Sequence, residues 1–311
     1  MNSPELHTSY LIAFDGSQHS RSAVELLSDL CQTSKGARKI EVHLLTVFTP
    51  RQIKDHDLLH NNLMQAKQYL ESQQCFSVFT NLILGYPSEK ILEIAEQVKA
   101  DMILMGARGL RATFGILLGG VAQQVVEYAS CPVLVSRAPY NGLSHVLLAI
   151  DSSAYSQQAT SYLRKLNLPP SARLTVMHVL PPLPAEILSA TASEIWPIIA
   201  DQIPLSSSSS MRSVEDAGWL VEEENQGRDL LASALDYLKS AGREAEPLLL
   251  RGDAATEIIN FAKDNKIELI IAGSRGLSQL RGLFIGSVSR KLVHYADSSV
   301  LIVKSPTYSP N

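Results

Sequence analysis

Two glycine-rich segments of this sequence have the composition and spacing to hold phosphate groups. Both follow the pattern G-x2-G-x9-G, which begins at Gly106 in the first segment and at Gly273 in the second. Glycine lets the backbone approach a ligand closely and take positive φ values. The exposed N–H groups of such turns attract anions. We therefore expect a phosphate-binding loop at each segment, although turn glycines and a helix cap alone would also produce single pieces of the pattern.

The two segments differ at their last position. The second ends in Gly286-Ser287, just before a helix predicted over residues 288–296, and helix N-termini favour phosphate. Ser287 adds a hydroxyl donor there, whereas Gly120 follows Gly119 in the first segment. Losing one neutral hydrogen bond costs about 1 kcal/mol. We expect the main site in the second segment and a weakened or purely structural one in the first.

Charged side chains accompany each loop. Asp15 and Asp151 each end a short apolar run, at residues 11–14 and 147–150. Each could serve as a metal ligand, a general base or a ribose acceptor, and the lack of a second acid or histidine in the motif favours binding over catalysis. Arg108 and Arg275 lie inside the loops, where they suit phosphate recognition and a surface or interface ion pair equally well.

Other candidates for chemistry are weaker. His56 and His60 flank Asp57 at i, i+4 spacing, but no further ligands accompany them, so a solvated helix start is the better interpretation. His178 lies in a predicted strand and is expected to be a packed polar residue. No Walker-type lysine, nucleophile elbow or dinucleotide motif is found. We expect no catalytic residue and no metal site built by the protein alone.

The elements that must position these residues occur twice. Residues 101–135 align with residues 268–302 without a gap, and 13 of the 35 positions are identical. We expect one domain over residues 1–140 and a second over residues 141–311. The second domain carries about 31 extra residues, because the offset between the halves grows from 136 to 167. They are placed at about residues 181–226, rich in Pro and Ser.

This insertion is predicted to be a flexible loop. Its apolar residues Ile195, Trp196, Ile198 and Ile199 could form a short docked segment within it. Because it leaves the second domain at the end of a strand near the expected ligand, it could act as a lid. A disordered tether is the preferred alternative, on account of the serine run at residues 206–210.

Strands and helices alternate along both halves. The strands are apolar without alternation, which is typical of a parallel sheet covered on both faces. Ligands of such sheets bind beyond the carboxyl ends of the strands, where the strand order reverses. Asp15 and Asp151 end the first strands, and Gly106 and Gly273 end the fourth. Strands are predicted at 10–14, 40–47, 76–84, 102–105, 132–136, 146–150, 173–179, 246–250, 269–272 and 300–303, and helices at 20–31, 58–72, 89–99, 121–128, 156–166, 229–240, 256–265 and 288–296.

The net charge, the apolar runs and the cysteines argue against several classes of protein. The chain has 311 residues, 45% of them hydrophobic, and a net charge of −4. The acidic balance argues against nucleic-acid binding, and no apolar run is long enough to span a membrane. No signal peptide is recognised. Three cysteines without a C-x-x-C pair indicate reduced thiols and a cytoplasmic protein.

Taken together, the doubled loop, the aspartates that end the first strands and the duplication resemble the nucleotide-binding universal stress proteins, in a tandem form. The resemblance implies a five-stranded parallel sheet in the order 3-2-1-4-5 in each half, with helices on both faces. It implies ATP bound with Mg²⁺, contacts from the strand-one aspartate to ribose or adenine, and adenine contacts from the end of strand two. The implied residues are Asp151, Val179, Gly273, Arg275, Gly276, Gly286, Ser287 and Val288 in the second half, and Asp15, Val47, Gly106, Gly109, Gly119 and Gly120 in the first.

The same resemblance shapes the functional expectation. It implies a cytoplasmic sensor or regulator of a stress response that binds an adenine nucleotide, rather than an efficient enzyme. The fifth strands commonly pair two domains in this family, so the two copies should pair within one chain, and two chains could associate further as a homodimer. A slow ATPase or adenylyl-transfer enzyme, and an interaction protein with vestigial sites, remain as alternatives.

Overall fold

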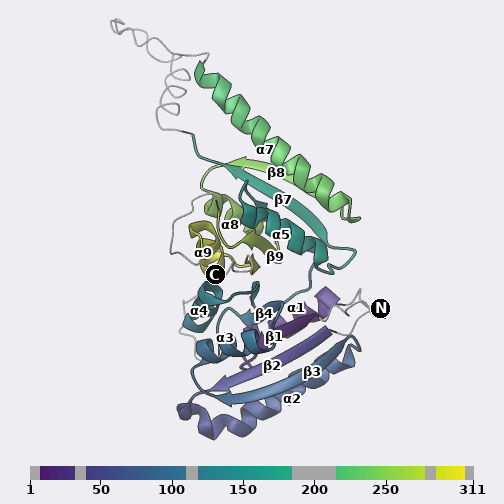
Figure 1. Ribbon diagram of the computed structural model, residues 1–311, viewed down its shortest axis with the longest axis vertical. Helices are drawn as coiled ribbons and strands as arrows, with labels where there is room; N and C mark the ends of the chain where they lie inside the picture. The colour runs from purple at the N-terminus through teal and green to yellow at the C-terminus, as the bar shows by residue number, and fades with distance from the viewer. Residues whose placement is uncertain (1–7, 32–39, 110–117, 184–214, 277–284, 305–311) are drawn as a thin grey trace, which may run out of the picture.

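The computed structural model describes residues 8–31, 40–109, 118–183, 215–276 and 285–304. The first half, coloured purple to blue in Figure 1, alternates strands and helices as expected. Its strands are β1 (Ser9–Ala13), β2 (Ile40–Phe48), β3 (Phe76–Leu84), β4 (Met102–Gly106) and β5 (Val133–Ser136), and its helices are α1 (Gln18–Cys31), α2 (His56–Ser72), α3 (Pro87–Gln97) and α4 (Gly120–Tyr128), with a 3₁₀ helix η2 (Pro50–Asp55) before α2.

The second half, in teal, green and yellow, repeats this order (Figure 1). Its strands are β6 (His145–Ile150), β7 (Arg173–Leu180), β8 (Glu246–Arg251), β9 (Leu269–Gly273) and β10 (Ser299–Val303), and its described helices are α5 (Ala154–Lys165), α7 (Glu215–Lys239), α8 (Ala254–Asp264) and α9 (Ser287–Tyr295).

The ten strands found in the described ranges form one sheet, in the order β3-β2-β1-β4-β5-β10-β9-β6-β7-β8. Each half therefore has the order 3-2-1-4-5, with parallel neighbours, which confirms the predicted fold. The halves meet at β5 and β10, which pair antiparallel with Leu134 opposite Leu301. The expected pairing of the two copies within the chain is thus present.

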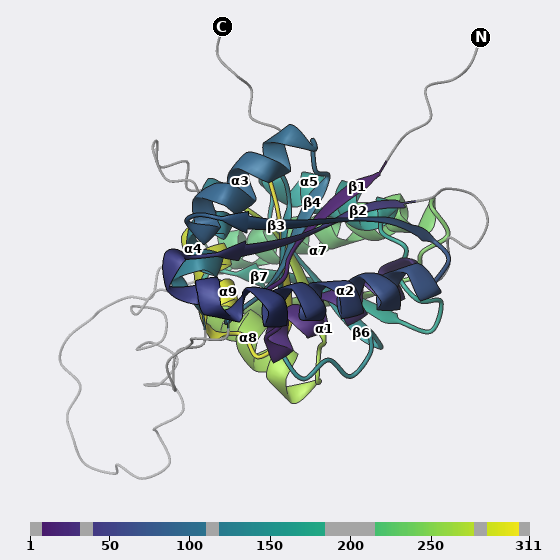
Figure 2. The same ribbon diagram turned by 90° about the horizontal axis from the view of Figure 1, so that it is seen from below.

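Each face of the sheet carries its own layer of helices. Helices α1, α2, α5 and α7 pack on one face, and α3, α4, α8 and α9 on the other. Figure 2 shows α2 and α3 on opposite sides of the first-half strands. Within β1, Leu11 and Ile12 are both fully buried but face opposite layers. This two-sided burial explains why the strands are continuously apolar.

The helices begin slightly earlier than predicted, because the serines that precede α1 and α5 cap them. Ser17 Oγ accepts the N–H of Ser20 at 3.2 Å, and Ser153 Oγ accepts the N–H of Ser156 at 3.2 Å. Such caps satisfy N–H groups that have no acceptor within the helix. Both α1 and α5 thereby start three residues after the aspartate that follows the first strand of their half.

The prediction of a flexible loop over residues 181–226 is wrong at its C-terminal end. Strand β7 ends at Leu180 and residues 181–183 follow it outside any helix or strand, whereas residues 215–226 form the first half of α7; residues 184–214 lie outside the described residues. Gly227 lies in the middle of α7, although glycine weakens helices. In the structure a Cβ at Gly227 would lie 3.0–3.2 Å from side chains of Leu249, Leu180 and His178, so this glycine lets α7 cross β7 and β8 closely.

An ion pair holds the same end of α7. Arg251 Nη1 lies 2.5 Å from a carboxylate oxygen of Glu223 and also donates to the carbonyl of Pro181 at 2.9 Å. The N-terminal end of α7 extends past the ends of β7 and β8 (Figure 1). The early part of α7 is therefore anchored through β8 rather than through the body of the sheet.

The two halves also complete each other's helix ends. Arg137, which follows β5, donates to the carbonyl of Val293 in the last turn of α9 at 2.6 Å. Lys304, which follows β10, donates to the carbonyl of Glu127 in the last turn of α4 at 2.9 Å. Cations at helix C-termini satisfy free carbonyls and interact favourably with the helix dipole. The exchange is reciprocal across the β5–β10 seam.

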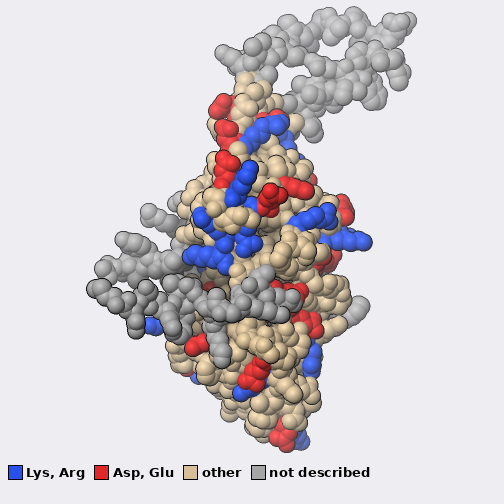
Figure 3. All heavy atoms as spheres, turned by 90° about the vertical axis from the view of Figure 1, so that its right-hand side faces the viewer, with Lys and Arg blue, Asp and Glu red and all other residues tan. Residues whose placement is uncertain are grey.

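The surface carries charges of both signs. On the face shown in Figure 3, Lys and Arg side chains gather over the second half with Asp and Glu among them. Basic residues occupy the last turns of α5, at Arg164 and Lys165, and of α7, at Lys239. Within the described ranges, no helix combines the length and the apolarity needed to cross a membrane.

Candidate nucleotide sites

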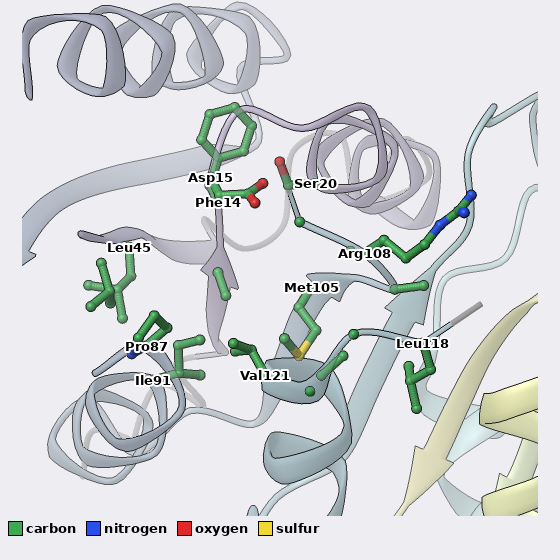
Figure 4. Close-up of a pocket in the computed structure, with 18 of the residues that line it drawn as sticks. Phe14, Asp15, Ser20, Leu45, Pro87, Ile91, Met105, Arg108, Leu118 and Val121 are labelled. Carbon is green, nitrogen blue, oxygen red and sulfur yellow. The ribbon is translucent and has the colours of Figure 1, made fainter. Parts of the chain in front are cut away.

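In each half, the described residues line a cavity at the carboxyl edge of the sheet. The first has a volume of about 440 Å³ and the second about 280 Å³. Figure 4 shows the first cavity, with Asp15, Met105, Arg108 and Val121 drawn from β1, β4 and α4 and the segments after these strands. Every predicted site residue lines its cavity: Asp15, Val47, Gly106, Gly109, Gly119 and Gly120 line the first, and Asp151, Val179, Gly273, Arg275, Gly276, Gly286, Ser287 and Val288 line the second.

The two aspartates occupy equivalent positions against the second glycine of each loop. One carboxylate oxygen of Asp15 accepts the N–H of Ser17 at 3.0 Å, and Asp151 accepts the N–H of Ser153 at 3.0 Å. The other oxygen of Asp15 would lie 2.5 Å from a Cβ at Gly109, and that of Asp151 2.8 Å from one at Gly276. A larger residue there would displace the carboxylate, so glycine leaves each aspartate in its place at the cavity, where carboxylate oxygens accept hydrogen bonds.

The first glycine of each loop has a different task. A Cβ at Gly106 would lie 2.7–2.8 Å from His19 and the N atom of Ser20, and one at Gly273 would lie 2.7 Å from backbone atoms of Tyr155. These contacts are with the first turns of α1 and α5. The first glycine is therefore needed for close strand–helix packing, in addition to lining the cavity.

The third glycine of each loop directly precedes α4 or α9, and its own N–H already has an acceptor. The N–H groups that can bind an anion therefore begin one residue later, at the first residue of each helix. The N–H of Gly119 donates to the carbonyl of Ala107 at 2.7 Å, and that of Gly286 to Ser274 at 2.7 Å. The next three N–H groups of each helix have no acceptor within the helix. In α9 they belong to Ser287, Val288 and Ser289.

The first residue of each helix is exposed at the cavity in both halves. Ser287 brings a hydroxyl to this position in α9, and Gly120 brings none in α4. A Cβ at Gly120 would meet no heavy atom within 4 Å. The missing hydroxyl is therefore not a consequence of crowding.

The loop arginines contact the helix that follows the first strand. Arg108 Nε lies 3.2 Å from His19 Nε2, and in Figure 4 the Arg108 side chain extends away from Asp15. Arg275 lies 5.7 Å from the Tyr155 ring centroid and donates to its hydroxyl at 3.4 Å. The arginines thus have equivalent aromatic neighbours, His19 and Tyr155, in the first turns of α1 and α5.

His19 links this region to the seam. Its Nδ1 lies 3.1 Å from the N–H of Ala138, and a neutral imidazole accepts a hydrogen bond at only one nitrogen. Burial, together with the charge of Arg108, lowers the pKa of His19. Because the neutral ring accepts the N–H of Ala138 at Nδ1, its Nε2 carries the proton. Arg108 therefore packs beside the ring and does not donate to it.

The far end of each cavity is apolar. In the first half it is formed by Leu45 and Val47 of β2 and by Pro87 and Ile91 of α3. The second half has the matching set Met177, Val179, Ala254 and Ile258. The α3 and α8 residues were not expected from the motif. They share the same offset of 167 residues as the loop glycines, and extending the repeat alignment upstream would have found them.

Two polar residues of the first cavity were also missed. Thr49 and Gln52 line it from η2 and the residue before it, an element that was not predicted. Thr49 followed by Pro50, with Gln three positions later, is a helix-start pattern that would have indicated this turn.

The histidines weighed from the sequence lie apart from both cavities. His56 lies 3.3 Å from Asp57, and its ring stacks on His60 at 6.5 Å between centroids. His178 Nδ1 lies 2.9 Å from the carbonyl of Ile150, within the sheet. Among the described residues, no group of three His, Cys, Asp or Glu side chains is placed to hold a metal ion.

The chain was compared with known proteins. The family model described as Universal stress protein family matches residues 9–137 and 142–304. A universal stress protein of Mycobacterium bovis is 24% identical over 257 residues, covering 79% of this chain and 76% of that protein. A protein of unknown function from Pseudomonas aeruginosa has the same fold, with a TM-score of 0.64 and 16% identity over 97% of this chain and 94% of the other.

A further solved structure, of a universal stress protein in complex with cAMP, matches 42% of this chain and 95% of the other at 23% identity and a TM-score of 0.34. The family model covers most of both halves, on either side of the β5–β10 seam. This chain therefore belongs to the universal stress protein family, with two family domains in tandem.

Proposed function

We propose that this protein is a cytoplasmic regulator that binds adenine nucleotides, ATP with Mg²⁺ in the second half above all. The observation that carries the proposal is the convergence of three features on one cavity, in both halves. These are an aspartate at the end of the first strand, glycines that admit a ligand next to it, and the start of a nine-residue helix.

Each feature matches a different part of a nucleotide. The first turn of α9 offers backbone N–H groups and the Ser287 hydroxyl to phosphate oxygens. The carboxylate of Asp151 suits a ribose hydroxyl, which donates to it. The apolar end beside Val179 and Ile258 suits the faces of a base.

A magnesium ion would be held mainly by the nucleotide. Mg²⁺ prefers oxygen ligands and is often bound through substrate phosphates and water, with few protein carboxylates. Asp151 is the one acidic residue that lines the second cavity in the described part of the chain. The residues present fit a cation that enters with the phosphates.

The same residues support binding rather than rapid turnover. Hydrolysis needs a positioned base for water and a cation at the transferred phosphate. The cavity-lining residues offer one carboxylate, which already accepts from the N–H of Ser153. Cys31, Cys75 and Cys131 are not paired in disulfides, which fits a reducing compartment.

Equilibrium binding tests the proposal. Wild-type protein titrated with Mg·ATP should bind it, and Ser287→Gly should weaken that binding without changing the thermal midpoint of unfolding. Absence of binding by the wild type at millimolar ATP would refute the proposed function. ATP turnover well above background, abolished by Asp151→Ala, would instead favour an enzyme.

A homodimer remains part of the proposal. The edges of β5 and β10 pair with each other inside the chain, so a second chain would have to use another surface. Light scattering that gives only the mass of one chain would exclude it.

A further inference from the structure

The first cavity differs from the second at both ends. At the phosphate end it has Gly120 where the second has Ser287. At the apolar end it has Thr49 and Gln52, and it is the larger of the two, at about 440 Å³ against about 280 Å³. Two residues after Val179, the second half has Pro181, which has neither a side-chain hydroxyl nor a backbone N–H.

The orientation of the Gln52 amide follows from its contacts. Its Oε1 lies 3.0 Å from the backbone N of Thr49 and 3.0 Å from Thr49 Oγ1. A backbone N–H can only donate, so the amide oxygen must face Thr49. This capping arrangement holds the side chain in place at the start of η2. The NH₂ group is then the donor that Gln52 can offer to a ligand in the cavity.

We propose that the first cavity selects a purine nucleoside through its base, with the NH₂ group of Gln52 as the specificity-determining donor. This inference rests on the proposed nucleotide-binding function and deepens it. The two halves then bind different classes of ligand: the first selects at the base, and the second selects at the phosphates.

The residues that line the first cavity support this division of ligands between the two halves. Purines present ring nitrogens that accept hydrogen bonds, and Leu45, Pro87 and Ile91 supply apolar surface for the faces of the ring. Asp15 remains at the cavity as an acceptor for a ribose hydroxyl. A nucleoside uses all of these groups, whereas additional phosphates would meet backbone N–H groups without the hydroxyl found in α9.

The test uses the full chain and the variant Gln52→Glu. Glutamate keeps an oxygen that accepts from Thr49 and removes the NH₂ donor, and glutamate is itself common at this position of a capping box. Gln65→Glu makes the same change of charge at an exposed position on α2 and serves as the matched control. Each protein is titrated calorimetrically with adenosine and with Mg·ATP.

We expect Gln52→Glu to weaken adenosine binding at least ~10-fold, because a site built to hydrogen-bond a ligand discriminates strongly once the partner is lost. Mg·ATP binding at the second site should change less than ~2-fold, and Gln65→Glu should match the wild type. The pair Ile91→Phe and Ile258→Phe, at equivalent buried positions, assigns the sites: the first should abolish adenosine binding and the second should weaken the Mg·ATP site.

Three results separate the two ideas. Adenosine binding that is unchanged in Gln52→Glu, or equally weakened in Gln65→Glu, overturns the inference. Wild-type protein that binds Mg·ATP but not adenosine also overturns it and leaves the proposed function intact. Wild-type protein that binds neither ligand refutes the proposed function itself.

Discussion

Placing a serine at Gly120 should raise the affinity of the first half for ATP. Gly120 is the first residue of α4, at the position that Ser287 occupies in α9. No heavy atom lies within 4 Å of the position that a Cβ would take. The substitution therefore adds a hydroxyl at the cavity without steric cost.

The magnitude follows from the kind of hydrogen bond that is gained. A hydrogen bond to a charged group contributes about 1.5–3 kcal/mol, and each 1.4 kcal/mol changes a dissociation constant about tenfold. We expect ATP to bind the first half roughly 10- to 100-fold more tightly in Gly120→Ser. Adenosine has no phosphate to receive the hydroxyl, so its binding should not change.

Calorimetric titration of Mg·ATP should resolve the two sites as a tight and a weak class. Gly120→Ser should bring the weak class towards the tight one, and Ser287→Gly should weaken the tight class by a similar factor. If both variants leave the ATP isotherm unchanged, the first hydroxyl of these helices does not bind phosphate and the reasoning fails. A gain for adenosine equal to that for ATP would also contradict it.

Three further substitutions test other parts of the structure. Gly273→Ala would put a Cβ 2.7 Å from backbone atoms of α5 and should lower the free energy of unfolding in urea by about 1–3 kcal/mol. Gly218→Ala in α7, where a Cβ meets no heavy atom within 4 Å, should raise it by up to about 1 kcal/mol. Equal effects of the two substitutions would contradict the packing argument. Asp151→Asn should weaken ATP binding about 10-fold and reduce discrimination against ATP analogues that lack ribose hydroxyls; undiminished discrimination would exclude the ribose contact. Burial lowers the pKa of the Lys304 amine to about 8, so between about pH 8 and pH 10 the unfolded chain holds a proton that the native protein has lost. The free energy of unfolding should therefore rise with pH over this range, and Lys304→Met should remove the rise. Parallel pH profiles of wild type and variant would refute this.

The repeat made most of the fold predictable. Once Gly106 was aligned with Gly273, each half supported the other, and the strand order, the layers and the β5–β10 pairing agree with expectation. The predicted site residues line one cavity for the same reason, because parallel strands bring Asp15 and the loop glycines to one edge. Residues that recur at the same offset in both halves and lie at the same edge of the sheet are predictable from sequence alone.

Features that cannot be read from the alignment of the two halves were harder to predict. Helix α7 is longer than its counterpart α2, and Gly227 lowers its helix propensity while tertiary contacts with Leu180 and Leu249 stabilise it. Thr49 and Gln52 follow the second strand, where the halves have no similarity. The use of the Gly286 N–H by a loop carbonyl depends on a turn that composition does not specify.

The reciprocal capping by Arg137 and Lys304 has a consequence for how the two halves can diverge. When identical domains associate around a twofold axis, one surface patch must fit itself, and any change occurs on both sides at once. Within a single chain each side can change alone. Arg290 already pairs with Glu127 at 3.6 Å, while the equivalent positions hold Gln123 and His294. Covalent linkage has thus released this interface from twofold symmetry, and with it the requirement that the two cavities bind the same ligand.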